Sequence, residues 1–371
     1  MRWLSDDAVD RLREEADLPD LGSSKYIVIH KLGSGGMGAV YLAQDVDLGR
    51  KVAVKVMNVA DATGALASRM MREAHIVALL EHPSIVPIHD VGTLDDGRVF
   101  YAMKLVQGAR LDQSAEGAAS LYDVLRIFQK VCEAVAFAHA RGVIHRDLKP
   151  ENIMVGPFGE VLVMDWGVAK VLNAVRGIDN GQATDDRRRS SGRRHLSLED
   201  ADLIATLPLA AGSAGDTTGG TVIGTPAYMA PEQARGQTEL LDERSDVYAL
   251  GAILYFLLTG RPPYESGGAT DAREQAGAGR PMRPRQIDPK IPRAIEAICL
   301  KAMSAEREDR YASAKEMAGD VVSFLDGEPV LAYRENIFEK AGRWLGKNRF
   351  IVLLIMAYLI MRLLVFFFVG R

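Results

Sequence analysis

The main change in the spacing of apolar residues along this chain of 371 residues lies close to Gly108, and that change most constrains its fold. Before Gly108, apolar residues alternate with polar ones in short runs bounded by turn residues, which is typical of strands. These runs are YIVIHKLG, AVYLAQD, KVAVKVM, IVPIHDVGTL and RVFYAMKLV. After Gly108, apolar residues recur every three or four positions, as in amphipathic helices. The sequence therefore predicts an α+β fold with two lobes.

The helical patterns are unequally divided between these lobes. The small, β-rich lobe has one, over 66–81. The larger lobe is mostly α-helical, with patterns over 121–142, 243–259, 292–303 and 313–325.

The composition excludes several classes of protein. Hydrophobic residues make up 48% and charged residues 25%, which excludes a wholly disordered, collagen-like or coiled-coil chain. The net charge of −4 gives no global positive field, so we expect no nucleic-acid partner. Cys132 and Cys299 are too few for a disulfide framework or a zinc site of the usual spacing.

One segment near the C-terminus departs from this average. The run from Phe350 to Val369, FIVLLIMAYLIMRLLVFFFV, has one charge, Arg362, in twenty residues. As a helix it measures about 30 Å, the thickness of a bilayer core, and it predicts a C-terminal transmembrane helix over 350–369. Arg362 opposes this reading by about 2.5–3.5 kcal/mol unless its side chain reaches the interface. The alternative is a buried C-terminal helix, but such helices are seldom apolar on every face.

The flanking residues predict how this helix is oriented. Basic residues precede it, at Arg334, Lys340, Arg343, Lys347 and Arg349. By the positive-inside rule, the chain crosses the cell membrane once, with the two lobes in the cytoplasm and the C-terminus outside. The acidic N-terminal residues contain no signal peptide, and with two residues beyond the span we expect no external sensor domain.

Three further segments carry their own signals. Residues 1–22 predict a helical extension, and 328–349 are amphipathic and basic. We expect the latter juxtamembrane segment to lie at lipid headgroups; the alternative is the partner site of a membrane adaptor. Residues 173–221, rich in Ser, Thr, Gly, Asp and Arg, predict a disordered insertion. Acidic residues flank its RRRSSGRR run at 187–194, which favours a solvated, phosphorylatable loop over a nucleic-acid or membrane patch.

A glycine-rich loop, from Gly33 to Val40, joins two strand-like runs. In a dinucleotide-binding fold such glycines begin a helix, whereas strands on both sides are typical of a lid over phosphates. Without side chains, the backbone N–H groups can approach phosphate oxygens closely. No run of the sequence matches GxxxxGK[ST], which excludes a P-loop.

Charged residues then follow in an order that packing alone does not explain. Lys55 ends the run VAVK in the third strand, and Glu73 lies in the next helical pattern, where it can pair with the lysine. The run HRDLKPEN at 145–152 is a dense polar loop between apolar residues. DWG at 165–167 follows the strand-like VLVMD, and GTPAYMAPE occupies 224–232.

Taken in order, these motifs resemble those of eukaryotic-type (Hanks-type) protein kinases, of the serine/threonine class common in bacterial membrane signalling. The resemblance covers residues 26 to 325 or so. It implies the bilobal protein kinase fold over 23–327, with an N-lobe at 23–107 and a C-lobe at 108–327. It also implies transfer of the γ-phosphoryl group of ATP to Ser/Thr hydroxyls of protein substrates.

The resemblance implies a role for each residue that matches a motif. Asp147 accepts the proton of the substrate hydroxyl, Lys149 neutralises the transferred group, and Thr225 steadies both. Lys55, held by Glu73, binds the α- and β-phosphates. The metal ligands are Asn152 and Asp165, which offer oxygens to Mg²⁺ or Mn²⁺. The other residues expected to contact the nucleotide are Leu32, Gly33, Ser34, Gly35, Gly36, Met37, Gly38, Val40, Ala53, Met103, Lys104, Val106 and Met154.

Within that set, Met103 would guard the adenine pocket, and the backbone of Lys104 and Val106 would bond the base. Outside it, Asp246 resembles the residue that ties a central helix to the catalytic loop. Glu232 and Arg310 resemble the buried ion pair of the C-lobe.

Two departures from the family pattern stand out. Trp166 replaces the usual phenylalanine, and we expect it to fill the same apolar pocket. The segment from Asp165 to Glu232 is 68 residues long, and its surplus over the usual length is the predicted insertion.

Arg146, beside the catalytic aspartate, resembles the arginine of kinases that are switched on by phosphorylation. We therefore expect autophosphorylation of the activation segment, and we leave open whether it occurs within a homodimer. The residues expected to be modified are Thr217, Thr218 and Thr221; Ser190, Ser191 and Ser197 are secondary and more simply explained by solubility.

The alternative to an active enzyme is a pseudokinase, a scaffold that binds nucleotide without transferring phosphate. Pseudokinases typically lose the equivalents of Lys55, Asp147 or Asp165, and all three are present in this sequence.

Overall fold

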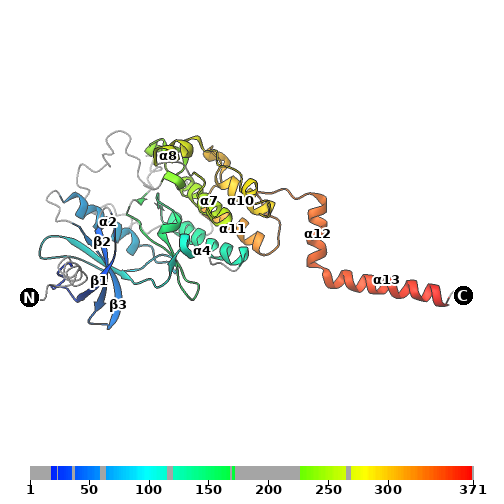
Figure 1. Cartoon of the computed structure of the whole chain (residues 1–371), viewed down its shortest axis with the longest axis horizontal. Helices are drawn as coiled ribbons and strands as arrows, with labels where there is room; N and C mark the ends of the chain where they lie inside the picture. Colours follow the sequence, from blue (N-terminus) through cyan, green and yellow to red (C-terminus); the bar gives the residue numbers. More distant parts are fainter. Residues whose placement is uncertain are drawn as a thin grey trace, which may run out of the picture.

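The computed structural model shows two lobes followed by two helices (Figure 1). The residues it describes are 18–22, 24–35, 38–58, 64–114, 120–167, 169–171, 226–264 and 269–369. The insertion predicted at 173–221 lies outside these residues, as does most of the helical extension predicted at 1–22.

The N-lobe is built on a five-stranded antiparallel sheet with the strand order β1-β2-β3-β5-β4. Each strand coincides with one of the alternating runs, with β1, β2 and β3 one residue longer than their runs, so the predicted strands are confirmed. Their bounds are β1 Tyr26–Ser34, β2 Gly38–Asp45, β3 Arg50–Met57, β4 Ile88–Thr93 and β5 Val99–Lys104. Helix α2, Ala65–Ala78, packs against β4 and β5 and confirms the helix predicted in this lobe.

Strand β3 is buried on both faces of this sheet, and its successive residues point to opposite sides. On β3, Val52 and Val54 belong to an outer core that also contains Leu21, from the segment before β1. Ala53 and Met57 point the other way and belong to the core shared with α2 and the C-lobe. The same alternation places Lys55 on the face directed toward the C-lobe.

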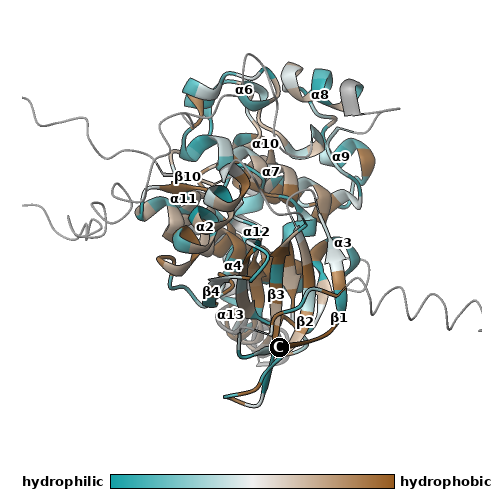
Figure 2. Cartoon of the chain, turned by 90° about the vertical axis from the view of Figure 1, so that its left-hand side faces the viewer, coloured by the Kyte–Doolittle hydropathy of each residue, from teal (hydrophilic) through white to brown (hydrophobic). Residues whose placement is uncertain are grey.

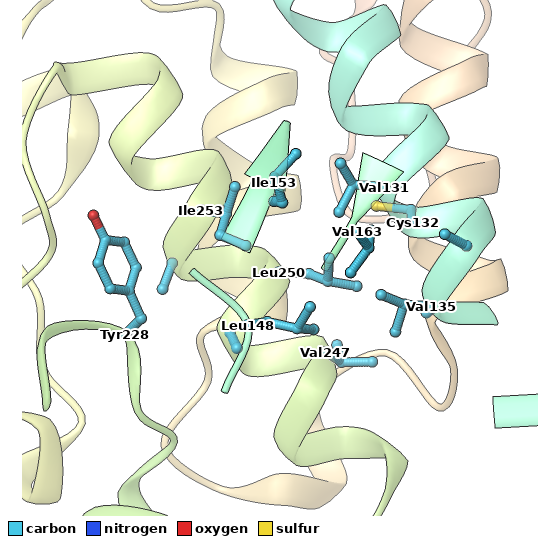
Figure 3. Close-up of a cluster of buried hydrophobic side chains, with 14 of the residues drawn as sticks. Val131, Cys132, Val135, Leu148, Ile153, Val163, Tyr228, Val247, Leu250 and Ile253 are labelled. Carbon is cyan, nitrogen blue, oxygen red and sulfur yellow. The ribbon is translucent and has the colours of Figure 1, made fainter. Parts of the chain in front are cut away.

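The C-lobe is organised around α4 and α7, with α11 packed on α4 and α10 packed on α7. Their bounds, α4 Leu121–Ala140, α7 Glu243–Thr259, α10 Arg293–Ala302 and α11 Ala314–Leu325, confirm the helices predicted in this lobe. Apolar side chains of α4 and α7 meet those of two short strands and the catalytic loop in one buried cluster. Figure 3 labels members of this cluster from α4 (Val131, Cys132, Val135), from α7 (Val247, Leu250, Ile253), and from the loop and the two strands (Leu148, Ile153, Val163).

Shorter elements complete this lobe. The helices are α3 Leu111–Ser114, α6 Pro231–Ala234, α8 Ala269–Ala278 and α9 Pro284–Ile287, with 3-10 turns at Pro150–Asn152, Pro226–Tyr228, Thr238–Leu240 and Arg307–Asp309. The strands are β6 Ala109–Arg110, β7 Val143–Ile144, β8 Ile153–Val155, β9 Val161–Val163 and β10 Lys170–Val171. Figure 2 shows mainly hydrophobic residues along β3 and hydrophilic ones on α8, as expected for a buried strand and a surface helix.

Local signals place the ends of α4, which precedes the catalytic loop. Ser120 caps its first turn, where Ser120 Oγ accepts a hydrogen bond from Asp123 N at 3.2 Å. Past its last residue, Gly142 has a φ of 72°, which glycine adopts at no steric cost. This turn carries the chain directly into β7 and the loop that follows.

Beyond α11, the chain is held to the C-lobe by Asp320. Asp320 Oδ1 accepts from Leu331 N at 2.7 Å, and Asp320 Oδ2 accepts from Ala332 N at 3.0 Å. Helix α12, Ile337–Lys347, stays in contact with the C-lobe, where Glu339 Oε1 lies 3.8 Å from Arg293 Nη1 of α10, and helix α13, Arg349–Val369, projects away from both lobes (Figure 1). In the part of the chain that the structure describes, no helix has the length and apolarity needed to cross a membrane. The transmembrane helix expected over 350–369 stays a prediction.

Candidate active site

Lys55 on β3 and Glu73 on α2 form the ion pair that the sequence predicts. Lys55 Nζ lies 2.9 Å from Glu73 Oε1 and 3.2 Å from Glu73 Oε2. The two side chains are 14% and 2% exposed, so water screens their attraction weakly. An ammonium group fixed in this way still has a side open to a phosphate oxygen.

Asp165 lies close to the same ammonium group. Asp165 Oδ1 is 3.8 Å from Lys55 Nζ, and the aspartate side chain is 53% exposed. It follows β9, which pairs with β8, and Met164 N donates to Asn152 O at 2.8 Å. The β8–β9 hairpin therefore brings the two predicted metal ligands, Asn152 and Asp165, to neighbouring positions.

Asp147 is surrounded by the polar residues that follow it in the catalytic loop. Lys149 Nζ donates to Asp147 Oδ2 at 2.8 Å. Asn152 Nδ2 donates to Asp147 O at 2.8 Å and to Asp147 Oδ2 at 3.3 Å. Because the amide nitrogen of Asn152 is used in this way, its amide oxygen can serve as a metal ligand.

Asp246, at the start of α7, binds the backbone of the catalytic loop. This confirms the prediction that it ties a central helix to that loop. Its carboxylate accepts from His145 N at 2.7 Å and from Arg146 N at 2.9 Å, and lies 2.8 Å from His139 Nε2. Burial alone favours the neutral acid, but the His139 hydrogen bond and nearby positive charge outweigh it, and the pKa of Asp246 lies below its ordinary value.

The backbone is strained at two points of this site. Arg146 has a φ of 71° and Asp165 a φ of 59°, and among the described residues these are the non-glycine residues with positive φ. Such conformations cost about 1–3 kcal/mol each and persist where surrounding contacts enforce them. Asp246 supplies that contact for Arg146, through its hydrogen bond to Arg146 N.

Trp166 fills a buried position beside the catalytic loop, as expected for an aromatic residue after Asp165. It is 1% exposed, and its ring lies 4.5 Å, centroid to centroid, from that of His145. Within the described residues, Trp166 Nε1 has no hydrogen-bond partner. Its contribution is therefore packing rather than polar contact.

The glycine-rich loop requires glycine at one described position above all. At Gly38, a Cβ would lie 2.4 Å from Val56 O, so any side chain would force β2 and β3 apart. At Gly33, by contrast, a Cβ would meet nothing within 4 Å. Leu32 and Ser34 are exposed beside it, whereas Gly36 and Met37 lie outside the described residues.

The predicted adenine contacts lie along neighbouring strands of the two lobes. Met103 on β5 pairs with Ala53 on β3, and both are buried. Lys104 N donates to Pro87 O at 3.1 Å, so its carbonyl is the group that can bond a base. The remaining residues expected around the base are half-buried: Val40 on β2, Val106 after β5 and Met154 on β8.

Several predicted site residues cannot be placed. Thr225, expected to steady Asp147 and Lys149, and the phosphorylation candidates Thr217, Thr218 and Thr221 lie outside the described residues. Ser190, Ser191 and Ser197 do so as well.

Two residues of the site were missed by sequence reasoning. Tyr101 OH donates to Glu73 Oε1 at 2.8 Å, although a tyrosine in an apolar strand reads as ordinary core. Gln233 Nε2 donates to Arg146 O, and its one signal was its place directly after Glu232.

Comparisons with known proteins agree with this geometry. A family model described as a protein kinase domain matches residues 26–186 and 209–320, and the chain belongs to this family. The residues between the two matched stretches fall inside the predicted insertion. Membership implies the use of ATP and a divalent metal ion, and substrates that are proteins.

The relatives are bacterial serine/threonine kinases. The serine/threonine-protein kinase PknD of Protochlamydia amoebophila (strain UWE25) is 33% identical over 333 residues, which cover 85% of this chain and 31% of that protein. The probable serine/threonine-protein kinase PknB of Bifidobacterium longum (strain NCC 2705) is 35% identical over 318 residues, covering 83% and 40%. The chain thus spans well under half the length of these relatives.

Proposed function

We propose that this chain is an ATP-dependent protein kinase that phosphorylates serine and threonine hydroxyls of proteins. The observation that carries the proposal is a single arrangement of charge: Lys55 Nζ lies 2.9 Å from Glu73 and 3.8 Å from Asp165, and Asn152 links this group to the Asp147–Lys149 pair. A scaffold that only binds nucleotide needs Lys55, Glu73 and Asp165. It has no use for a carboxylate and an ammonium group held 2.8 Å apart beside them.

Phosphoryl transfer requires positioning and neutralisation of charge more than covalent help. Lys55 offers its ammonium group to the α- and β-phosphate oxygens. Asp147 aligns the attacking hydroxyl and accepts its proton, and Lys149 neutralises negative charge on the transferred group. A lysine two residues after the aspartate supports the serine/threonine class rather than the tyrosine class.

Mg²⁺ is the divalent ion that best fits the donors. Asn152 and Asp165 offer an amide oxygen and a carboxylate, the hard ligands that Mg²⁺ prefers; Mn²⁺ accepts the same ligands. Among the described residues, no group of three or more His, Cys, Asp or Glu side chains gathers. That suits an ion that takes its other ligands from phosphates and water, and that neutralises phosphate charge when bound.

The decisive experiment is phosphate incorporation from labelled ATP into a protein substrate, compared between the wild type and Asp147→Asn. We expect Asp147→Asn to lose about 10²–10⁴-fold in kcat, since a general base contributes that much. Nucleotide affinity should be retained, because Asp147 contacts the hydroxyl rather than the nucleotide. Asp96→Asn, on the exposed β4–β5 turn, is the matched control. Nucleotide binding without transfer by the wild type would establish the pseudokinase instead.

Activation by autophosphorylation is the second part of the proposal, and an arginine cluster supports it. Burial, with the charges of Arg69 and Arg72, lowers the pKa of Arg146 despite the nearby Asp246. Arg146 Nε is buried and has no hydrogen-bond partner among the described residues. A phosphate adds about two negative charges, which this cluster can bind.

We place that phosphate on the activation segment, at Thr217, Thr218 or Thr221. Mass spectrometry of the active protein should find at least one of the three modified, and their combined replacement by alanine should lower activity. Active protein with none of them modified contradicts this part. Transfer between two copies, as in a homodimer, predicts that autophosphorylation per molecule rises with protein concentration.

Membrane attachment through α13 is the third part. The helix is 21 residues long, and large apolar side chains among its described residues are exposed, such as Leu354 (71%) and Ile360 (56%). On α12, Ile337 and Trp344 are 82% and 57% exposed, which fits a helix at the headgroups. We propose a cell-membrane location with the kinase lobes on the cytoplasmic side.

This part is tested by fractionating cells that express the chain. The wild type should stay in the membrane after alkaline carbonate extraction, and a Leu354→Arg, Ile360→Arg variant should be released. Wild-type protein in the carbonate supernatant would refute attachment by α13 without touching the kinase proposal.

A further inference from the structure

Tyr101 lies in the middle of β5, directly across the sheet from Lys55. The two residues are partners in the β3–β5 register. Partners in an antiparallel pair point to the same face, and Lys55 Nζ accordingly lies 5.5 Å from the centroid of the tyrosine ring. Tyr101 is 4% exposed and packs against the Lys55–Glu73 pair on the buried side of the pair.

The hydroxyl of Tyr101 reaches the carboxylate that holds Lys55. Tyr101 OH donates to Glu73 Oε1 at 2.8 Å, and the same oxygen accepts from Lys55 Nζ at 2.9 Å. On the other side, Glu73 Oε2 lies 3.0 Å from the point where a Cβ on Gly167 would be. The carboxylate is thus confined between β5 and the residue after Trp166.

We propose that Tyr101 is a positioning residue for phosphoryl transfer: its hydroxyl holds Glu73 in the orientation that presents Lys55 to the nucleotide. This inference rests on the proposed kinase function. Helix α2 otherwise meets the core mainly through apolar side chains such as Met70 and Val77, whose contacts have no direction, and its Arg69 Nε donates a longer hydrogen bond, 3.4 Å, to Gly167 O. A hydrogen bond from a central strand does have direction, and its charged acceptor makes it one of the stronger kinds.

The environment of Tyr101 suits a constant donor. Burial first, and then the negative charge of Glu73, raise the pKa of Tyr101 well above its ordinary value. The phenol therefore keeps its proton throughout the physiological range. When Lys55 turns toward phosphate oxygens, Tyr101 still satisfies Glu73 Oε1, which would otherwise be a buried carboxylate oxygen without a donor.

The test compares Tyr101→Phe with Tyr26→Phe. Tyr26 is 2% exposed and lies in the same sheet, where Tyr26 OH donates to Asp90 Oδ2 at 3.3 Å in the outer core. Both substitutions remove from a buried tyrosine a hydroxyl bonded to a carboxylate, so both report on stability, although Asp90 is 40% exposed and Glu73 is 2% exposed. We expect Tyr101→Phe alone to lower kcat/KM for ATP, by about tenfold, and Tyr26→Phe to stay within about twofold of the wild type.

A second comparison separates positioning from packing. In a Glu73→Ala background, Tyr101→Phe should change kcat/KM by less than about twofold, because the acceptor is gone. The same tenfold loss in both backgrounds, or no loss in either, overturns the inference, as does an equal loss for Tyr26→Phe.

Failure of the kinase proposal would look different. If the wild type transfers no phosphate, the proposed function fails, and the Kd for ADP with Mg²⁺, measured by calorimetry, becomes the readout. Tyr101→Phe should then weaken ADP binding while Tyr26→Phe leaves it unchanged, and equal affinities of the two variants overturn the role of Tyr101.

Discussion

Two of the buried ion pairs among the described residues, Glu232–Arg310 in the C-lobe and Lys55–Glu73 in the N-lobe, differ in how fully their donors are used. Arg310 Nη1 and Nη2 donate to the two carboxylate oxygens of Glu232 at 2.8 Å each. The remaining capacity of this guanidinium goes to the backbone carbonyls of Ser304, Arg244 and Ala305. The Arg310 side chain is 0% exposed, so nothing from outside can join this pair.

The N-lobe pair is similar in length but open on one side. Lys55 is 14% exposed and lies 3.8 Å from Asp165, which is itself exposed to solvent. A pair whose donors are all used by the protein can only hold the fold together, whereas one with an open side can also bind a ligand. The N–O distance and the burial of the carboxylate are similar in the two pairs, so they do not distinguish a structural pair from one that can bind a ligand. The distinction lies in whether the protein uses the remaining N–H donors of the cation.

Removing the arginine of the closed pair, Glu232–Arg310, whose donors are all used within the protein, should have the largest effect on stability. Arg310→Leu leaves Glu232 as a buried charge without its partner, and we expect the free energy of unfolding to fall by about 3–5 kcal/mol. Urea denaturation measures it. Arg98→Leu, at the partly exposed Arg98–Asp96 pair, is the control and should change stability by at most about 1 kcal/mol. Equal losses of unfolding free energy in the two variants would contradict the view that the closed pair stabilises the fold more than the exposed pair does.

Removing the lysine of the open pair should affect catalysis more than stability. Lys55→Met is expected to lower kcat/KM by about 10²–10³-fold, as loss of one transition-state donor does. Its loss of stability should be smaller than that of Arg310→Leu, because Tyr101 still donates to Glu73. The comparison is measured by steady-state kinetics and urea denaturation on the same preparations. A Lys55→Met variant as unstable as Arg310→Leu would mean that the N-lobe pair is structural too.

The smallest expected effect concerns acid. Burial favours the neutral form of Glu232, but the hydrogen bond and charge of Arg310 outweigh it and lower the pKa of Glu232 from 4.5. A carboxyl whose pKa is depressed in the folded state adds stability above its unfolded pKa and loses it as the pH falls through the folded value. The urea midpoint of the wild type should therefore decline below pH 4.5 or so. Glu232→Gln should be less stable at neutral pH and decline less steeply. Parallel curves for the two proteins would contradict the assignment.

The motif residues could be predicted because each carries a local signal. Lys55, Asp147, Asn152 and Asp165 are polar residues in apolar surroundings, and their order along the chain indicates a kinase. Tyr101 carries no such signal: an aromatic residue in a strand reads as core, and only the β3–β5 register brings its hydroxyl to Glu73. The anchoring role of Asp320 was likewise unpredicted, since the groups that it anchors, Leu331 N and Ala332 N, are backbone N–H groups, which every residue but proline has.

The sequence by itself determined the two-lobed α+β fold and the order of the elements, and it predicted the residues that bind phosphate and metal. The fold and the order of the elements follow from the periodicity of apolar residues, a local property of a chain, and the roles of the site residues follow from the resemblance of their motifs to those of protein kinases. The tertiary structure alone decided which pairs are closed and which stay open to a ligand. The state of a pair depends on whether other acceptors use the remaining N–H donors of its cation, as the carbonyl of Ser304 does for Arg310. It also depends on which other donors reach its carboxylate, as the hydroxyl of Tyr101 reaches Glu73. Long-range geometry of this kind leaves no mark on the local pattern of residues.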